Sequence, residues 1–167
     1  MGSVAGSVES GLLSPNPHGA LASFARDTRG MSGVASWLER RTTPIELATL
    51  RSVLDRATVD AAERPIIVAL RAEGAEITVV VGDPTGTALV YFPPGYEDVA
   101  VGSLHSVGDR EAADADRWEP PLVAYYFTHH SEFPRWSVIP LSHGDRALEE
   151  FLDRPSEPPR SITWEPD

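Results

Sequence analysis

The chain has 167 residues, 41% of them hydrophobic, which suits one compact domain with its own core. It contains no cysteine, which excludes disulfide frameworks, thiolate metal sites and cysteine nucleophiles. Its net charge of −11 disfavours binding to nucleic acid or to anionic membranes and favours a basic protein partner. No apolar run approaches the roughly 20 residues that span a bilayer, and the N-terminus lacks a signal-peptide pattern, so the expected compartment is the cytoplasm.

The N-terminal segment differs in composition from the rest of the chain. Residues 1–30 are rich in Gly, Ser, Ala and Pro and show no sustained apolar period, so burial cannot offset their ordering entropy. We predict a disordered extension over residues 1–30 and a single folded domain over residues 31–167. Within that domain, residues 33–38 predict a first strand.

A helix is expected to follow this strand. Thr43 and Glu46 have the spacing of a capping box, with Pro44 at the first helical position. Apolar residues then recur near the 3.6-residue period, which predicts a helix over residues 44–58 with one face packed on a sheet.

The remaining segments favour an antiparallel sheet and a second helix. β-rich runs bounded by turn residues predict strands at 65–70, 76–81, 87–92, 99–107, 122–128, 135–141 and 161–164. Residues 108–121 form an acidic loop, and residues 129–134 join two of the strands. A second helix starts at Ser142 and ends at Pro155. The predicted fold class is α+β, an antiparallel β-sheet of about six to seven strands packed with two helices.

One group of side chains has the elements of a catalytic or metal site. It consists of His129, His130, Glu132 and His143. Adjacent histidines on a strand point to opposite faces, which opposes a shared ion. The spacing of His130 and Glu132 matches part of a zinc deaminase motif, but that chemistry needs cysteines that the chain lacks. Turn or interface histidines are the alternative, and we assign no catalytic, metal or cofactor residues.

Tryptophans and acids supply candidate binding surfaces. Trp37 and Trp164 lie in predicted strands and are expected in the core, whereas Trp118, in a polar loop, suits core or interface equally. Residues 97–119 hold seven acids against two arginines, and residues 142–167 hold seven against three. These segments are either a solvated surface or an acidic face that competes with nucleic acid for a basic cleft.

The C-terminal half carries a series of short motifs in a characteristic order. They are Tyr125-Tyr126-Phe127, Ser131-Glu132-Phe133-Pro134, Trp136, Ile139-Pro140, a helix with Leu148, Phe151 and Leu152, and Ile162-Thr163-Trp164-Glu165. In this order and spacing the chain resembles the Imm1 family of bacterial immunity proteins. With Trp37 and the helix that follows it, the resemblance extends over residues 33–166.

The resemblance implies an inhibitor without cofactor that binds a toxin domain of a polymorphic toxin system, often a nucleic-acid deaminase. Docking on the toxin's active-site mouth would use acidic loops and apolar anchors. The candidate toxin-binding residues are Asp109, Glu111, Asp114, Asp116, Trp118, Glu119, His130, Glu132, Phe133 and Trp136. Two other functions remain open: a small metal-dependent enzyme that uses the His/Glu group, and a regulatory module that binds another cellular protein.

Overall fold

The computed structural model describes residues 33–38, 41–96, 102–111 and 120–167. Over these residues the chain forms a sheet of nine strands with two α-helices and two short 3-10 helices. The strands are β1 (Gly33–Trp37), β2 (Arg41–Ile45), β3 (Ile66–Ala72), β4 (Ala75–Val81), β5 (Leu89–Phe92), β6 (Leu104–Val107), β7 (Leu122–Tyr126), β8 (His129–Phe133) and β9 (Thr163–Pro166). The helices are η1 (Leu47–Thr49), α1 (Leu50–Asp60), η2 (Arg135–Ser137) and α3 (Leu141–Asp153). The α+β prediction is confirmed, with more strands than expected.

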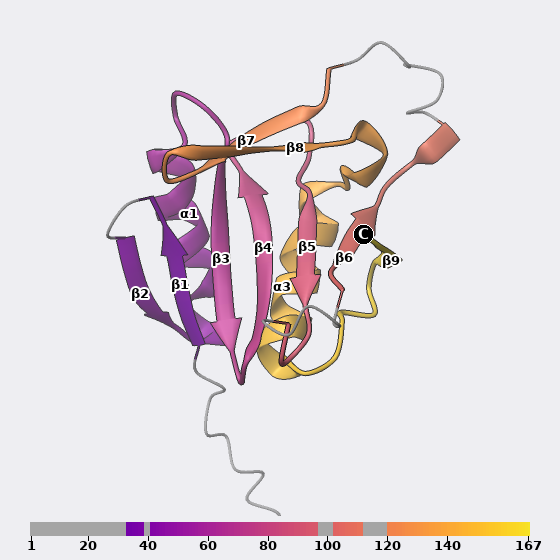
Figure 1. Ribbon diagram of the computed structural model, residues 1–167. Coiled ribbons are helices and arrows are strands. Elements are labelled where there is room, and N and C mark those ends of the chain that lie inside the picture. The colour runs from indigo at the N-terminus through magenta and orange to yellow at the C-terminus, as the bar shows by residue number, and fades with distance from the viewer. Residues whose placement is uncertain (1–32, 39–40, 97–101, 112–119) are drawn as a thin grey trace, which may run out of the picture.

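Seven strands form one continuous antiparallel ladder in the order β2-β1-β3-β4-β5-β6-β9. β7 departs from this ladder, because it runs parallel to β3 at a single register position, Ile66 opposite Tyr125. β8 pairs with β7 alone, so the two form a hairpin across one end of the sheet (Figure 1).

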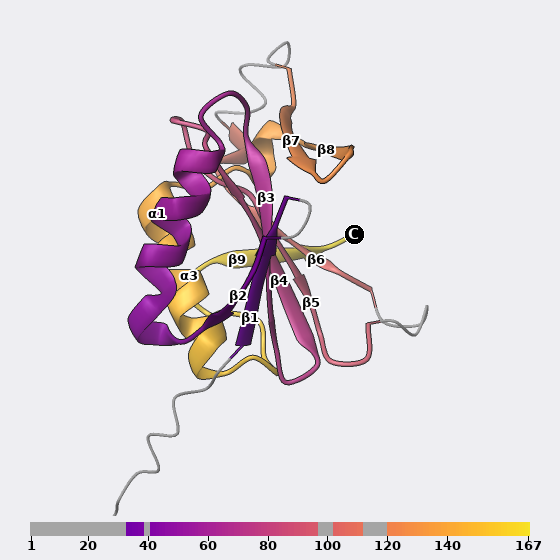
Figure 2. The same ribbon diagram turned by 90° about the vertical axis from the view of Figure 1, so that its left-hand side faces the viewer.

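Both long helices cover the same face of the sheet (Figure 2). Alternation along β3 and β4 sends Leu70 and Ile77 to this face, where both are fully buried. α1 contributes Leu54 and α3 contributes Phe151 to the same cluster. Trp37 belongs to this cluster too, is only 1% exposed, and donates its indole N–H to Asp60. Its predicted core position is therefore confirmed.

The opposite, helix-free face of the sheet is covered in part by the β7–β8 hairpin. Phe133 and Leu122, which face each other across the hairpin, pack on Ile67 and Val80 of the central strands. Phe133 is only 5% exposed, and burying an aromatic ring of this size contributes roughly 2 kcal/mol. The central strands are therefore buried on both faces, which explains why their apolar runs are nearly continuous.

The start of the first helix was predicted wrongly. Pro44 lies in strand β2, opposite Val34 of β1, and the α-helix begins at Leu50. The predicted capping pair was Thr43 with Glu46. In the structure Glu46 pairs instead with Thr49, because the N–H of Glu46 donates to the hydroxyl of Thr49 at 3.0 Å. The ring of proline fixes φ at a value that is compatible both with an edge strand and with the first turn of a helix. A proline in the sequence therefore does not distinguish an edge strand from a helix start.

The strand predicted over residues 135–141 was also wrong. Residues Arg135–Ser137 form a 3-10 turn, and Ile139 makes only an isolated bridge to Thr87 before α3 begins. The strand lies earlier, over His129–Phe133, in the segment expected to be a connection. Its first four residues are polar and exposed, so it lacks the apolar alternation that identifies strands in a sequence.

The expected N-terminal extension over residues 1–30 lies outside the described residues. Within the described part of the chain, neither long helix has the length and apolar character required to cross a lipid bilayer.

The carboxylate of Glu150 joins α3 to the segment that leads into β9. One of its oxygens accepts the backbone N–H groups of Arg160 at 2.8 Å and Ser161 at 2.9 Å. Burial of this carboxylate opposes its ionisation, but these hydrogen bonds and the guanidinium of Arg146 lower the pKa of Glu150 below its usual value. The ionised form thus holds the chain that positions the C-terminal strand.

Glu150→Gln should lower the free energy of unfolding by about 1 kcal/mol near neutral pH, because a charged acceptor becomes neutral. A carboxyl whose pKa is lowered by folding stabilises the fold above its unfolded pKa, and this contribution is lost as the pH falls through the folded value. Denaturation of both proteins at decreasing pH should therefore give converging stabilities. Glu149→Gln, at the exposed neighbouring position, is the control and should change little at any pH. An equal deficit of Glu150→Gln in acid and at neutral pH would contradict this role.

Candidate functional site

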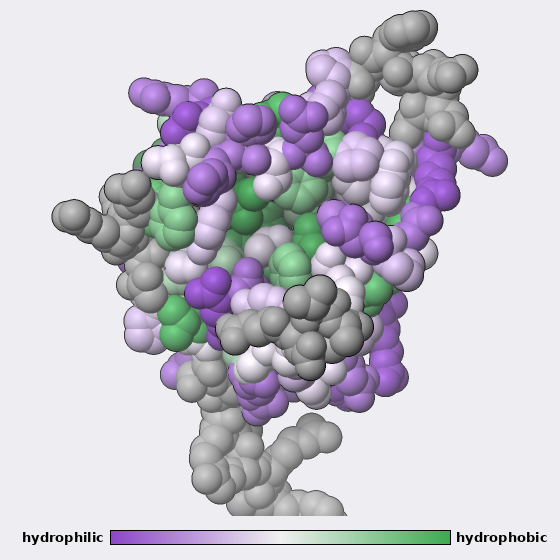
Figure 3. All heavy atoms as spheres, viewed as in Figure 1, coloured by the Kyte–Doolittle hydropathy of each residue, from purple (hydrophilic) through white to green (hydrophobic). Residues whose placement is uncertain are grey.

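The β7–β8 hairpin and the helix-free face of the sheet enclose a groove of about 320 Å³. In the space-filling view, apolar residues gather in the middle of this face below the hairpin, with hydrophilic residues around them (Figure 3). The hairpin wall includes Tyr126, Ser131, Glu132 and Phe133. The floor comes from Ile67, Glu76, Thr78, Val90 and Phe92, and the far wall from Ser103, His105 and Asp167. We call this feature the hairpin groove.

Two exposed carboxylates lie at the margin of the hairpin groove. The side chains of Glu132 and Asp167 are 62% and 70% exposed. The imidazole Nε2 of His105 lies 3.3 Å from a carboxylate oxygen of Asp167, and the hydroxyl of Ser103 donates to the other oxygen. The groove thus combines a largely apolar floor with carboxylates at its margins, an arrangement suited to a basic partner.

The buried carboxylate of Glu76 organises one end of the floor. It is 7% exposed and pairs with the guanidinium of Arg71, and it accepts the hydroxyl of Tyr96 at 3.0 Å. Burial first, and then the hydrogen bond to Glu76, raise the pKa of Tyr96. The phenol therefore stays protonated and donating, and these contacts satisfy a charge that would be costly if left unpaired.

Beyond Asp167, an arginine connects strand β9 with the turn η2. Arg110 pairs with Glu165 and its guanidinium lies 4.9 Å from the centre of the Trp136 ring. The N–H of Gly108 donates to the carbonyl of Trp136 at 2.6 Å, which keeps the segment near Asp109 against η2. The groove and this arginine–tryptophan contact share strand β9, so they form one continuous side of the molecule.

The tip of the hairpin is conformationally strained. The two-residue turn includes Phe127, whose φ is +54°, a region that residues other than glycine rarely adopt. Its ring lies 4.2 Å from that of Tyr126, centre to centre. An aromatic residue is thus kept at a position where glycine would be easier to accommodate.

The structure brings some of the sequence-predicted site residues together and separates others. His130 and Glu132 are exposed on β8, and Trp136 is half-buried under Arg110. Phe133 is buried, so its ring anchors the hairpin to the sheet and lines the groove, and offers little free surface. Asp109 and Glu111 are exposed, in the segment predicted to be an acidic loop, although Arg110 and Glu111 have a helical backbone. Asp114, Asp116, Trp118 and Glu119 lie outside the described residues.

The histidines weighed as a metal or catalytic group do not converge. His130 lies 4.0 Å from Glu132 on β8, whereas His143 lies on α3, the helix that packs against the other face of the sheet. Over the described ranges, no three histidine, aspartate or glutamate side chains are placed to hold one metal ion.

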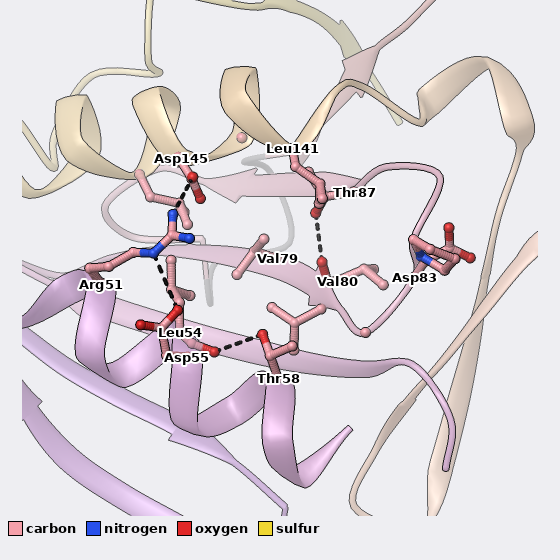
Figure 4. A pocket seen from close by; sticks show the side chains of 15 residues that line it. Arg51, Leu54, Asp55, Thr58, Val79, Val80, Asp83, Thr87, Leu141 and Asp145 are labelled. Atoms are coloured by element: carbon pink, nitrogen blue, oxygen red, sulfur yellow. Dashed lines mark hydrogen bonds and ion pairs between the residues drawn. The ribbon is translucent and has the colours of Figure 1, made fainter. Parts of the chain in front are cut away.

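A second cleft lies between the helices, near the ends of β4 and β5 (Figure 4). It encloses about 410 Å³, and its apolar walls include Leu54, Val79 and Leu141. Arg51 spans its mouth, with ion pairs to Asp145 at 2.8 Å and to Asp55 at 3.2 Å. This cleft contains none of the sequence-predicted site residues.

Several groove residues were missed from the sequence. His105 lies on β6 and Asp167 directly follows β9, at the end of the sheet, and Glu76 comes from β4 in the central part of the chain. Leu104 packs on the helix side of the sheet, and successive side chains of a strand point to opposite faces. This alternation in residues 104–107 was the available signal that His105 faces away from the helices. Nothing in the local sequence brings Asp167 to His105, because their contact depends on pairing between β6 and β9.

Comparison with protein-family models identifies a match over most of the described chain. A family model described as immunity protein Imm1 matches residues 39–166. Neither the curated proteins nor the solved structures that were compared with the chain gave a match.

The positive φ of Phe127 predicts an unusual order of stabilities. Phe127→Gly should unfold with a free energy about 1 kcal/mol higher than Phe127→Ala, because only alanine retains the strain. Both variants lose the ring contact, so their difference isolates the backbone. At Thr128, whose φ is not positive, the order should be reversed, with glycine less stable than alanine. Chemical denaturation measures all four, and the same order at both positions would contradict the assigned strain.

Proposed function

The chain belongs to the Imm1 family of immunity proteins, and from this membership we propose that it binds a cognate toxin domain and neutralises it by covering the active site. The match over residues 39–166 is the observation that carries the proposal, since it spans nearly all of the described chain. The toxin proposed as the partner is the one encoded beside the chain's own gene. An inhibitor of this kind requires only a complementary surface.

We place the binding surface on the helix-free side of the sheet. This side carries the hairpin groove, the exposed strand β8 and the contact between Arg110 and Trp136. An apolar centre with a polar margin is the usual composition of a protein interface. Glu132, Trp136 and the neighbouring Asp167 are the described residues from which we expect the largest contributions.

The charge of this surface supports a partner that acts on nucleic acid. Enzymes that hold a phosphate backbone present arginine and lysine in their binding clefts. Exposed carboxylates at Glu132 and Asp167 would pair with such a cleft and speed association. A deaminase is the toxin class that the family resemblance implies, and we propose it as the partner.

A stoichiometric inhibitor and an enzyme that destroys the toxin or its product differ in a direct titration. We expect toxin activity to fall linearly with added chain and to reach its minimum at one equivalent, with a one-to-one complex on size-exclusion chromatography. Co-expression of the chain with the toxin domain encoded beside its gene should restore cell growth. Inactivation of many equivalents of toxin by one chain would contradict the proposal and favour the enzyme.

Charge reversal at the groove tests the proposed surface. Asp167→Arg should weaken binding to the toxin at least about tenfold, because it places a cation against a basic cleft. Asp153→Arg is the matched control, since the two aspartates are 70% and 69% exposed and Asp153 lies at the end of α3. Calorimetry at low salt measures both affinities. If Asp153→Arg lowers the affinity for the toxin more than Asp167→Arg does, the toxin binds the helical side of the sheet and the proposed surface is wrong.

A further inference from the structure

Strand β8 forms an edge of the sheet, and some of its backbone groups have no partner among the described residues. Over the described ranges β8 pairs with β7 alone, on one side. In an antiparallel pair, the N–H and C=O of each residue point either both toward the partner strand or both away from it. The direction at each position of β8 therefore follows from the bonding of β7.

The bonding of β7 identifies which groups of β8 point outward. The N–H of Tyr125 donates to the carbonyl of Pro65 at 3.0 Å, on the side of β3, so it points away from β8. His130, directly opposite Tyr125, must then direct its own N–H and C=O away from β7. The same holds for Glu132, two residues further along. Among the described residues, none forms a hydrogen bond with these four backbone groups.

The two other edges of the sheet are protected, whereas β8 is not. β2 contains Pro44 and β9 contains Pro166, and proline cannot donate a backbone hydrogen bond. β8 has the sequence His-His-Ser-Glu-Phe, without proline, and it pairs with β7 in an unbroken register. Natural sheets usually protect their edges against added strands, so an unprotected edge on the proposed binding side is consistent with a binding role.

A strand added to β8 would extend over the hairpin groove. Ser131 and Phe133 line the groove, and residues opposite them on an added strand would point to the same face. A basic side chain at one of these positions would reach the carboxylate of Asp167 at the groove margin. The opposite face of the hairpin carries the side chain of Glu132 and the ring of Tyr125, whose centre lies 4.0 Å from the guanidinium carbon of Arg64 and 5.9 Å from the centre of the His130 ring.

We propose that the cognate toxin binds by adding an extended, basic segment as a new β-strand along the free edge of β8. This inference rests on the proposed function and names the way in which the partner is recognised. Backbone hydrogen bonds to His130 and Glu132 give the affinity, and the groove selects alternate side chains of the added strand.

Amide hydrogen exchange on the native chain tests the pairing directly, with the toxin domain encoded beside its gene as the probe. In the free chain the amides of His130 and Glu132 should exchange rapidly, and that of Ser131, which points to β7, slowly. In the complex, exchange at His130 and Glu132 should slow at least about tenfold. A complex in which these two amides still exchange as in the free chain overturns strand addition but leaves the inhibitor proposal intact. Absence of any complex overturns both.

Two substitutions at one position provide a second test. His130→Pro removes the outward N–H without removing a bond to β7, whereas His130→Ala removes the imidazole and keeps the N–H. The proline variant should bind the toxin domain at least about tenfold more weakly than the alanine variant. A lowered melting temperature would show that the proline variant has lost its hairpin. In that case the hydrogen-exchange experiment on the native chain decides whether a strand is added. Equal affinities of two folded variants overturn the proposal.

Discussion

The hydrogen bond from the N–H of Tyr125 to the carbonyl of Pro65 sets the position of the surface proposed to bind the toxin. It joins β7 to the beginning of β3 in parallel, whereas the neighbouring strands of the main ladder are antiparallel. Because a backbone group can bond in only one direction, the same bond determines that His130 faces outward. The hairpin is thus held across the sheet with its second strand free.

Burial of Phe133 and Leu122 on the central strands reinforces this arrangement. These side chains cover the apolar residues of β3 and β4 that the helices do not reach. The residual uncovered area becomes the hairpin groove, with Glu76 satisfied by Arg71 and Tyr96 at its floor. One packing contact therefore stabilises the fold and shapes the surface that we propose binds the toxin.

The acids of the C-terminal segment lie on two different sides of the structure. Residues 142–167 hold seven acids in the sequence, but those on α3 lie on the helical side, whereas Glu165 and Asp167 lie beside the groove. The acids on the surface that we propose binds the toxin are therefore a small part of the acids of the chain. The remaining acids are well placed to keep the surface solvated.

The local sequence was sufficient for the elements whose residues carry a period. The α+β class, the meander from β3 to β5, the helix after residue 140 and the core position of Trp37 follow from alternation, helical spacing and turn residues. The order of the C-terminal motifs was sufficient for the Imm1 family. Both kinds of signal arise from neighbours in the chain, and they need no knowledge of how distant segments meet.

Only the tertiary structure decided which residues share a surface. β8 is polar because it lies at an edge exposed to water, so its sequence pattern predicted a connection between strands. Pro44 fits a helix start or an edge strand, and pairing with β1 decides between them. His105 and Asp167 meet through the ladder of β6 and β9, with 61 residues between them in the chain. Such contacts depend on strand pairing across long distances, which the composition of either segment leaves undetermined.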